Sequence, residues 1–392
     1  MKQGSSFLAI PSVVYLLVWA PLILISKLDV FFFSVKGAPL IEAFVTYLIF
    51  NFFLVYGVSK LILKRRQKKF GIHKLEIYAL RQFTINLFKF WVVGFCINVA
   101  FSGGLPTFWV LMGDARAYSD FGIPTFSGFF NMIRMFIVIA LVICAIHKVP
   151  TPKYITYFLI FSFCAELNRA SIFFAVTGSV SAFLLFNKLR FRNFWKMSMV
   201  VVLFVASFSF IAEFREQVRG DYADPRDYFT YDVGELGAVL YIGLYFLTPL
   251  NNLYYQYDIG IEPTYTPYYT LSSILPTVIR EQVFTDKVRP TELASDAFNT
   301  SPYVANIISD YGFVGGLYVI TIIQFLICYV FIRASRSSLE HSLMYCVLWG
   351  ATLISVFTNL YFSLIVLAFP LLIAIFSRYK KRFIIDYGRR HF

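Results

Sequence analysis

The sequence predicts an all-α protein that crosses a membrane about ten times, within a range of about ten to twelve. Three observations predict this class. Hydrophobic residues make up 58% of the 392 residues and charged residues only 15%, and the mean hydropathy is +0.68. Apolar runs of roughly 17 to 25 residues, the length that a helix needs to cross the hydrocarbon core, recur along the chain. Basic residues gather in short segments between these runs.

The expected spans form two groups, one in residues 1–213 and one in residues 312–378. The first group occupies 7–26, 38–63, 83–102, 126–146, 154–167, 170–187 and 197–213, and the second occupies 312–332, 340–357 and 361–378. The first span is expected to be retained, because only Lys2 precedes it and no small-residue cleavage site follows at the usual distance. All five cysteines fall inside expected spans, so neither a disulfide nor a zinc site is expected.

Basic residues give the expected orientation. The segments 64–81, 188–196 and 378–390 contain 17 of the 35 lysines and arginines. Short basic loops beside helix ends are retained in the cytoplasm. Both termini are therefore expected in the cytoplasm, with 379–392 as a basic tail. This topology signal explains the net charge of +13 better than nucleic-acid binding does.

The segment Phe214–Tyr311 is the largest expected external loop. It contains 13 of the 22 acidic residues and 13 of the 26 tyrosines, so chemistry on polar molecules is expected there. Inside it lies Leu236–Leu250, which is short for a span and would force the basic tail outside if it crossed. We expect a re-entrant or interfacial helix near 236–256, with its tyrosines at headgroup depth.

Charged residues near the outer ends of the spans are the first candidates for binding groups. Arg134 lies about two turns into its span, and Glu166 and Arg169 flank the turn between two spans. Charges at membrane depth are costly, so they either anchor helix ends in pairs or serve a substrate. Arginine suits a phosphate ligand, because its planar fork donates two parallel hydrogen bonds and remains charged.

Histidine is absent from the segments that are expected outside. His73, His147, His341 and His391 all lie in segments expected in the cytoplasm, and the chain has no HExxH motif and no P-loop. A base on the external side must therefore be a carboxylate or belong to the substrate. No metal or cofactor is expected. Tyrosines beside Asn, Asp and Arg in the large loop suit glycan, although interfacial tyrosine belts give the same composition.

Two external stretches carry more specific motifs. Residues 118–128 read YSDFGIPTFSG and lead into the span that holds Arg134, while NTSPY at 299–303 is followed by SDYGFVGG at 309–316. Both stretches, with LNRA at 167–170 and VRG at 218–220, resemble the bacterial oligosaccharide repeat-unit polymerases, the Wzy or O-antigen polymerase family.

The resemblance implies a GT-C-like glycosyltransferase in the bacterial inner membrane, with its active site on the periplasmic face. The growing glycan would move from undecaprenyl pyrophosphate to the terminal sugar of an incoming undecaprenyl-pyrophosphate-linked repeat unit, in lipopolysaccharide or other polysaccharide biosynthesis. A chain-length regulator and a flippase would be its protein partners. The catalytic base would come from Glu213, Glu216, Asp221 or Asp310. The substrate-binding residues would be Arg134, Arg169, Arg215, Arg219, Arg280 and Arg289.

Three alternatives share parts of this pattern. An O-antigen ligase would use the same lipid donor, but such ligases carry a catalytic histidine in the external loop, where this chain has none. A lipid-oligosaccharide flippase or other transporter should line a central path with charged residues, whereas the last spans are nearly free of charge. A sensor with a tyrosine-rich external domain would need no arginines at membrane depth.

Overall fold

A computed structural model describes residues 6–27, 38–64, 72–114, 116, 120–187, 237–260, 262–275, 277–283, 300–336 and 338–391. Every regular element in these ranges is a helix. Four helices are long and apolar enough to cross a membrane, which suggests a multi-pass membrane protein. They are Pro39–Lys64 (α2), Lys74–Ser102 (α3, with its continuation to Leu111), Phe126–Ile146 (α5) and Tyr303–Ala334 (α12). The expected all-α class is confirmed for the part of the chain that is described.

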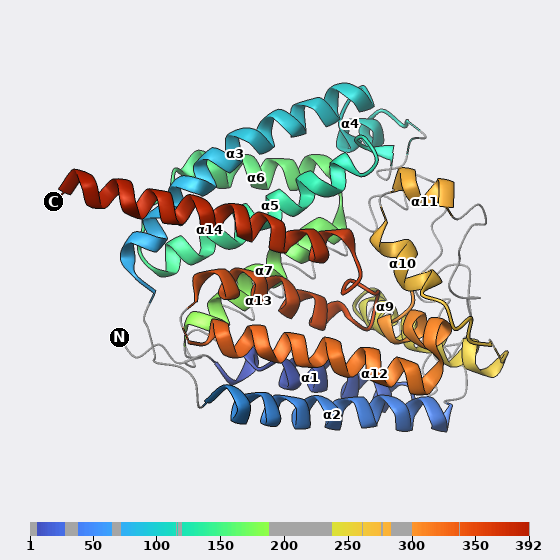
Figure 1. Ribbon diagram of the computed structural model, residues 1–392. Coiled ribbons are helices and arrows are strands. Elements are labelled where there is room, and N and C mark those ends of the chain that lie inside the picture. The colour runs from blue at the N-terminus through green and yellow to red at the C-terminus, as the bar shows by residue number, and fades with distance from the viewer. Residues whose placement is uncertain are drawn as a thin grey trace.

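Each expected span in the described ranges coincides with a helix, and the span at 197–213 lies outside those ranges. The remaining helices of the first half are Phe7–Ala9 (η1), Pro11–Ile25 (α1), Pro106–Leu111 (α4), Lys153–Glu166 (α6) and Arg169–Phe186 (α7). Those of the second half are Gly237–Asp258 (α9), Tyr268–Ile274 (α10), Thr277–Val283 (α11), Leu339–Ile354 (α13) and Leu364–His391 (α14). Their elongated arrangement side by side gives the molecule two distinct ends (Figure 1).

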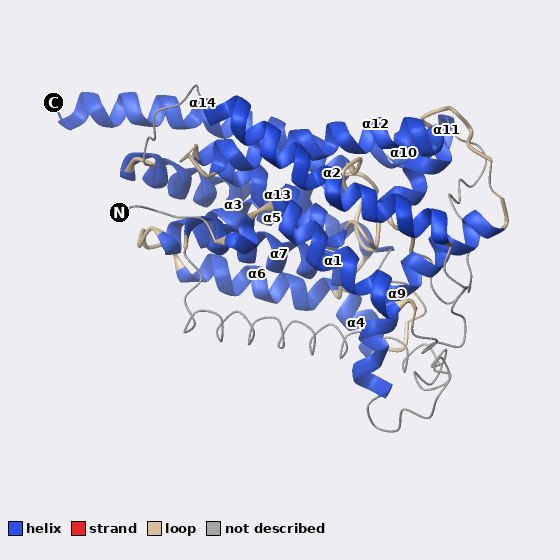
Figure 2. Ribbon diagram, turned by 90° about the horizontal axis from the view of Figure 1, so that it is seen from below, coloured by secondary structure: helices blue, strands red, loops and turns tan. Residues whose placement is uncertain are grey.

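One end of the bundle carries the first and last described residues of the chain. The N–H of Ser6 donates to the Leu184 carbonyl in the last turn of α7, and α14 ends at the same end of the bundle (Figures 1 and 2). Side chains tie segments that are far apart in sequence together at this end. Arg81 donates to the Pro150 carbonyl at 2.7 Å, and Arg336 donates to the Leu63 carbonyl at 2.7 Å. The short helices α4, α10 and α11 lie at the opposite end (Figure 1). The expected cytoplasmic and external segments in the described ranges are thus separated to opposite ends.

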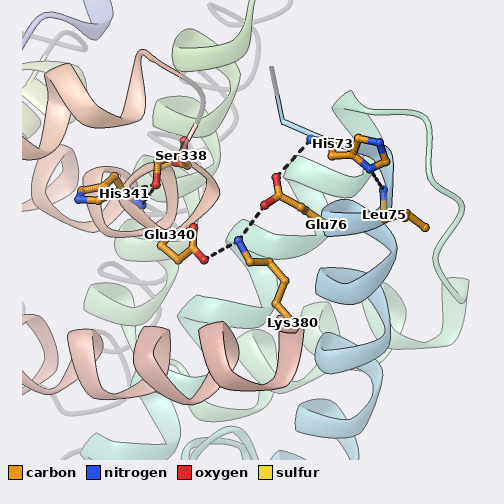
Figure 3. A network of polar contacts seen from close by, with 8 residues as sticks. His73, Leu75, Glu76, Ser338, Glu340, His341 and Lys380 are labelled. Atoms are coloured by element: carbon orange, nitrogen blue, oxygen red, sulfur yellow. Dashed lines mark hydrogen bonds and ion pairs between the residues drawn. The ribbon is translucent and has the colours of Figure 1, made fainter. Parts of the chain in front are cut away.

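An ion network holds α14 to its neighbours at the end with the termini (Figure 3). Lys380 Nζ lies 2.8 Å from Glu76 Oε1 of α3 and 2.6 Å from Glu340 Oε1 of α13. Glu76 also accepts from the backbone N–H of His73, whose ring accepts from the N–H of Leu75. This capping box explains why α3 begins at Lys74, about two turns before the apolar run at 83–102.

The helix α5 forms the centre of the bundle, because it packs against α3, α7, α13 and α14. Its buried side chains include Phe136, Ile139 and Ile143, none of which is exposed to solvent or lipid. Phe136 meets Phe83 of α3 edge to face at 5.6 Å and Phe376 of α14 at 6.2 Å. A polar residue on α5 therefore has to find its partners inside the protein.

The helix α12 begins earlier than the sequence indicates. The expected span starts at residue 312, but the helix starts at Tyr303, whose backbone N–H donates to the Ser355 carbonyl at 2.9 Å. Gly312 breaks it with φ 65° and ψ −178°, a conformation that only glycine adopts readily. The expected start of the span at residue 312 coincides with this break, and residues 303–311 before it are helical as well.

The helix expected near 236–256 coincides with α9, Gly237–Asp258. Leu250, Leu253 and Tyr254 are buried, and α9 packs against α1. Its position relative to a membrane surface stays a prediction.

Candidate functional site

A buried ion pair joins α5 to α6. It lies near α4, because the Thr107 hydroxyl of α4 donates to the carbonyls of Cys164 and Ala165, directly before Glu166. Arg134 Nη2 lies 2.8 Å from Glu166 Oε2, and their side chains are only 1% and 8% exposed. Arg134 also donates to Asn131 Oδ1 at 2.6 Å and to Ser162 Oγ at 3.4 Å. Its guanidinium lies over the Phe163 ring at 4.4 Å. The guanidinium is thus anchored on several sides, as a buried charge requires.

The turn before α5 is fixed by two side chains of α3, Asn98 and Ser102. Asn98 Oδ1 accepts from the backbone N–H of Ile123 and from the hydroxyl of Ser127, both at 3.1 Å. Gly122, at φ 85°, donates its N–H to Ser102 Oγ, and a side chain at this glycine would collide with Ser127. The FGIP motif therefore forms a tight turn that leads the chain into α5.

Two small cavities flank the ion pair. The one that Glu166 lines, called here the glutamate cavity, measures about 30 Å³, and the one that Arg134 lines, called here the arginine cavity, measures about 110 Å³. Asn131 and Asn168 line both cavities. The glutamate cavity is also lined by Trp91, Phe95, Asn98, Phe121, Ser127 and Phe130. The arginine cavity is also lined by Met135, Phe163, Ser171, Phe174, Ala175 and Ile365.

Polar groups with hydrogen-bonding capacity to spare surround these cavities. Glu166 bonds Arg134 through Oε2, which leaves Oε1 as a further acceptor. Asn168 caps α7 by accepting from the Ser171 N–H through Oδ1, which leaves its NH₂ group as a donor. A cavity of about 30 Å³ has room for about one water-sized group. The site in this conformation therefore suits single oxygen atoms of a hydroxyl or phosphoryl group rather than a whole sugar ring.

Aromatic residues from the segment between α3 and α5 cover the site. Phe121 lines the glutamate cavity and lies 6.4 Å from the Phe95 ring and 6.3 Å from the Trp109 ring. Arg116 stacks over Trp109 at 4.2 Å and bonds Asp114 Oδ2 at 2.6 Å. The hydrogen bonds from Arg116 lower the pKa of the Asp114 carboxyl. This loop therefore provides an apolar wall for the cavity and a charged outer face.

Asp310 has a role that the sequence does not suggest. Asp310, one of the expected candidates for the base, lies within α12, is fully buried and binds the start of α10. Its two carboxylate oxygens accept from the backbone N–H groups of Tyr269 at 2.8 Å and Thr270 at 2.7 Å. The Thr270 hydroxyl donates to it at 2.7 Å. Both oxygens are thus engaged in holding α10 against α12.

Only some of the remaining expected site residues lie in the described part of the chain. Arg169 begins α7, next to Asn168, and the position of its side chain lies outside the description. Arg280 is exposed on α11. Glu213, Glu216, Asp221, Arg215, Arg219 and Arg289 lie outside the described residues. Of the charged residues that the sequence singles out, Arg134 and its partner Glu166 are the two with a described place in the cavities.

Three asparagines are the functional candidates that the sequence did not single out. Asn98, Asn131 and Asn168 come from α3, α5 and the turn before α7. A sequence signal exists for Asn131, which lies one helical turn before Arg134 and so on the same face. Among the described residues, no group of three or more His, Cys, Asp or Glu is placed to hold a metal ion.

Comparisons with models of protein families, with curated proteins and with solved structures find no match to this chain.

Proposed function

We propose that this chain is a membrane glycosyltransferase that polymerises lipid-linked oligosaccharide repeat units. In this proposal the growing glycan leaves undecaprenyl pyrophosphate and is transferred to the terminal sugar of an incoming lipid-linked unit. The observation that carries the proposal is the buried Arg134–Glu166 pair, with asparagines around two adjoining cavities at the end of the bundle opposite both termini. The resemblance of the FGIP and SDYG segments to the polymerase family supports the same function.

The chemistry of these groups fits such a transfer. Departure of a pyrophosphate builds negative charge, which a fixed arginine stabilises without reorganisation. Arg134 is held in place by Glu166, Asn131 and Ser162, and it lines the arginine cavity. Glu166 Oε1 and the Asn168 amide would bond hydroxyls of the acceptor sugar and orient them for attack. The catalytic base remains proposed among Glu213, Glu216, Asp221 and Asp310, with Glu166 as a further candidate.

Variants of the ion pair separate its chemical role from its structural one. Removing either partner alone leaves a buried charge, so Arg134→Ala should destabilise the protein by about 3 to 5 kcal/mol. The double variant Arg134→Met with Glu166→Met replaces both charges by apolar groups and should keep much of the stability. We expect the double variant to accumulate in membranes but to lose polymerisation by about 100-fold or more.

The measurement is the length of surface polysaccharide in a strain that lacks the native protein, with the amount of each variant determined by immunoblotting. Glu166→Gln is a second variant, which removes the charge of Glu166 but keeps the shape of its side chain. Ile322→Ala on the exposed face of α12 is the matched control. Arg169→Ala and Arg219→Ala test the expected pyrophosphate ligands in the same strain. Long chains from the double variant, or from both the Arg169 and Arg219 variants, would refute the proposed site.

A further inference from the structure

A third cavity, of about 250 Å³, lies between α2, α9 and α12. None of these helices lines the glutamate or arginine cavity. Its lining residues from α2 and α9 are Ile41, Leu253, Gln256 and Tyr257, and those from the following turn are Gly260, Glu262 and Pro263. The lining residues from α12 are Ala305, Ile308, Ser309 and Phe313. We call this the α2–α12 cavity.

The break in α12 builds one wall of this cavity. Because Gly312 interrupts the helix, the Ser309 carbonyl is available for a partner outside α12. The backbone N–H of Thr264 donates to it at 2.8 Å, which pins the segment after α9 to α12. Pro263 lies 3.5 Å from the position that a Cβ at Gly312 would occupy. The wall is thus closed by backbone hydrogen bonds and close packing.

The lining of the α2–α12 cavity is mainly apolar. Phe313 meets Phe44 edge to face at 5.3 Å and Tyr257 at 6.0 Å, so a cluster of rings borders the space. The Ser309 carbonyl is already bonded to Thr264. Glu262 is exposed, and Gln256 is buried and has a hydrogen-bonding or electrostatic partner. A ligand rich in hydroxyls would find few polar partners here, whereas a hydrocarbon would fit.

Residues next to the cavity lining on α2 and α12 present exposed apolar side chains. Leu40, next to Ile41, is 50% exposed, and Val314, next to Phe313, is 71% exposed. The same two helices carry a series of exposed apolar side chains along their length, among them Phe50, Leu54, Tyr318 and Ile322. In a helix that crosses a membrane, such a face contacts lipid chains. A chain in the bilayer can therefore enter the cavity sideways.

We propose that the α2–α12 cavity binds the hydrocarbon chain of a membrane lipid. Three features favour this occupant over a glycan or a peptide. They are the apolar lining, the wall that the Thr264–Ser309 hydrogen bond holds in place, and the exposed apolar side chains next to the cavity. The site is separate from the Arg134–Glu166 site and does not rest on the proposed transferase function.

Photocrosslinking tests this proposal on the full chain purified in detergent. The probe is a phosphatidylcholine with a diazirine on one acyl chain, added at a molar amount equal to the protein, and peptide mass spectrometry locates the crosslinks. We expect them to concentrate on 253–263 and 305–313. Ile308→Trp fills the cavity and should reduce this labelling about tenfold, as a loss of apolar contact predicts.

Two further variants distinguish a filled cavity from a misfolded protein. Ile322→Trp adds the same bulk to an exposed position of α12 and should leave the labelling unchanged. Ile308→Ala enlarges the cavity, so the labelling should stay the same or increase. Crosslinks spread evenly over the exposed faces of α2 and α12 in the native protein would overturn the proposal. Undiminished labelling of an Ile308→Trp protein that elutes as a single folded species would also overturn it.

Discussion

Arg134 combines two properties that are rarely found together in a membrane helix. It is 1% exposed, and it nevertheless lines a cavity. The cost of burying its charge is offset by Glu166, Asn131 and Ser162, each on the same or the next helix. An arginine held in this way needs no rearrangement to receive an anionic group, which is the property that a transferase of phosphorylated substrates requires.

Single residues were predictable from sequence where burial makes their chemistry costly. Arg134 and Glu166 stand out because charges at membrane depth are rare. Asn98 does not stand out, since its role depends on where the turn at Ile123 lies in space. The contact of Asp310 with α10 was not predictable, because α10 lies about forty residues earlier in the chain and sequence spacing does not reveal such a contact.

Asp310→Asn provides the test at the residue scale. An amide supplies one acceptor oxygen instead of two, and its NH₂ group would face N–H donors at the start of α10. We expect α10 to loosen, with a loss of about 1 to 3 kcal/mol in local stability. Hydrogen exchange on a peptide that covers 268–275 measures this directly. Unchanged exchange there would show that Asp310 does not hold α10.

Helices were predictable where an apolar run is long and ends in clear signals. The spans at 38–63 and 126–146 match α2 and α5 closely, because both runs are continuous and bounded by polar or turn residues. The helical residues 303–311 of α12 were not predicted, because NTSPY and SDYG are typical of turns. Burial of Tyr303, Val304 and Ile307 favours a helix there. Tertiary packing thus overrode the local turn signal.

Gly312→Ala tests whether the break in α12 requires glycine. The native backbone at this position, φ 65° and ψ −178°, is accessible to glycine but strained for alanine. We expect a loss of about 1 to 3 kcal/mol, measured as a lower thermal midpoint. Gly57→Ala on α2 is the matched control, because nothing lies within 4 Å of its added Cβ. That control should stabilise the protein slightly. Equal midpoints for the two variants would contradict this account of the break.

The arrangement of the whole molecule follows from alternating spans and basic segments. Residues that the sequence assigns to the cytoplasm meet at one end, where Lys380 joins Glu76 to Glu340 (Figure 3). The candidate site forms at the other end, from α3, α5, α6 and α7. Its three-dimensional assembly was not predictable, because the contacts between these helices depend on side-chain packing that the apolar pattern leaves open.

Cysteine labelling tests the orientation of the molecule. In a chain whose five native cysteines are replaced, single cysteines at the exposed positions 258 and 262 should react with an impermeant maleimide added outside the cell. Cysteines at the exposed positions 335 and 386 should react only after the membrane is opened. The reverse pattern would place the candidate site in the cytoplasm and exclude an external polymerase.

Synthesis by the purified protein tests the central claim most directly. The chain would be placed in lipid vesicles with an undecaprenyl-pyrophosphate-linked repeat unit, and the products separated by length. The account predicts a ladder of glycans differing by one repeat unit, formed without added metal or nucleotide and lost in the Arg134→Met, Glu166→Met double variant. Folded native protein that forms no product longer than one repeat unit would contradict the account.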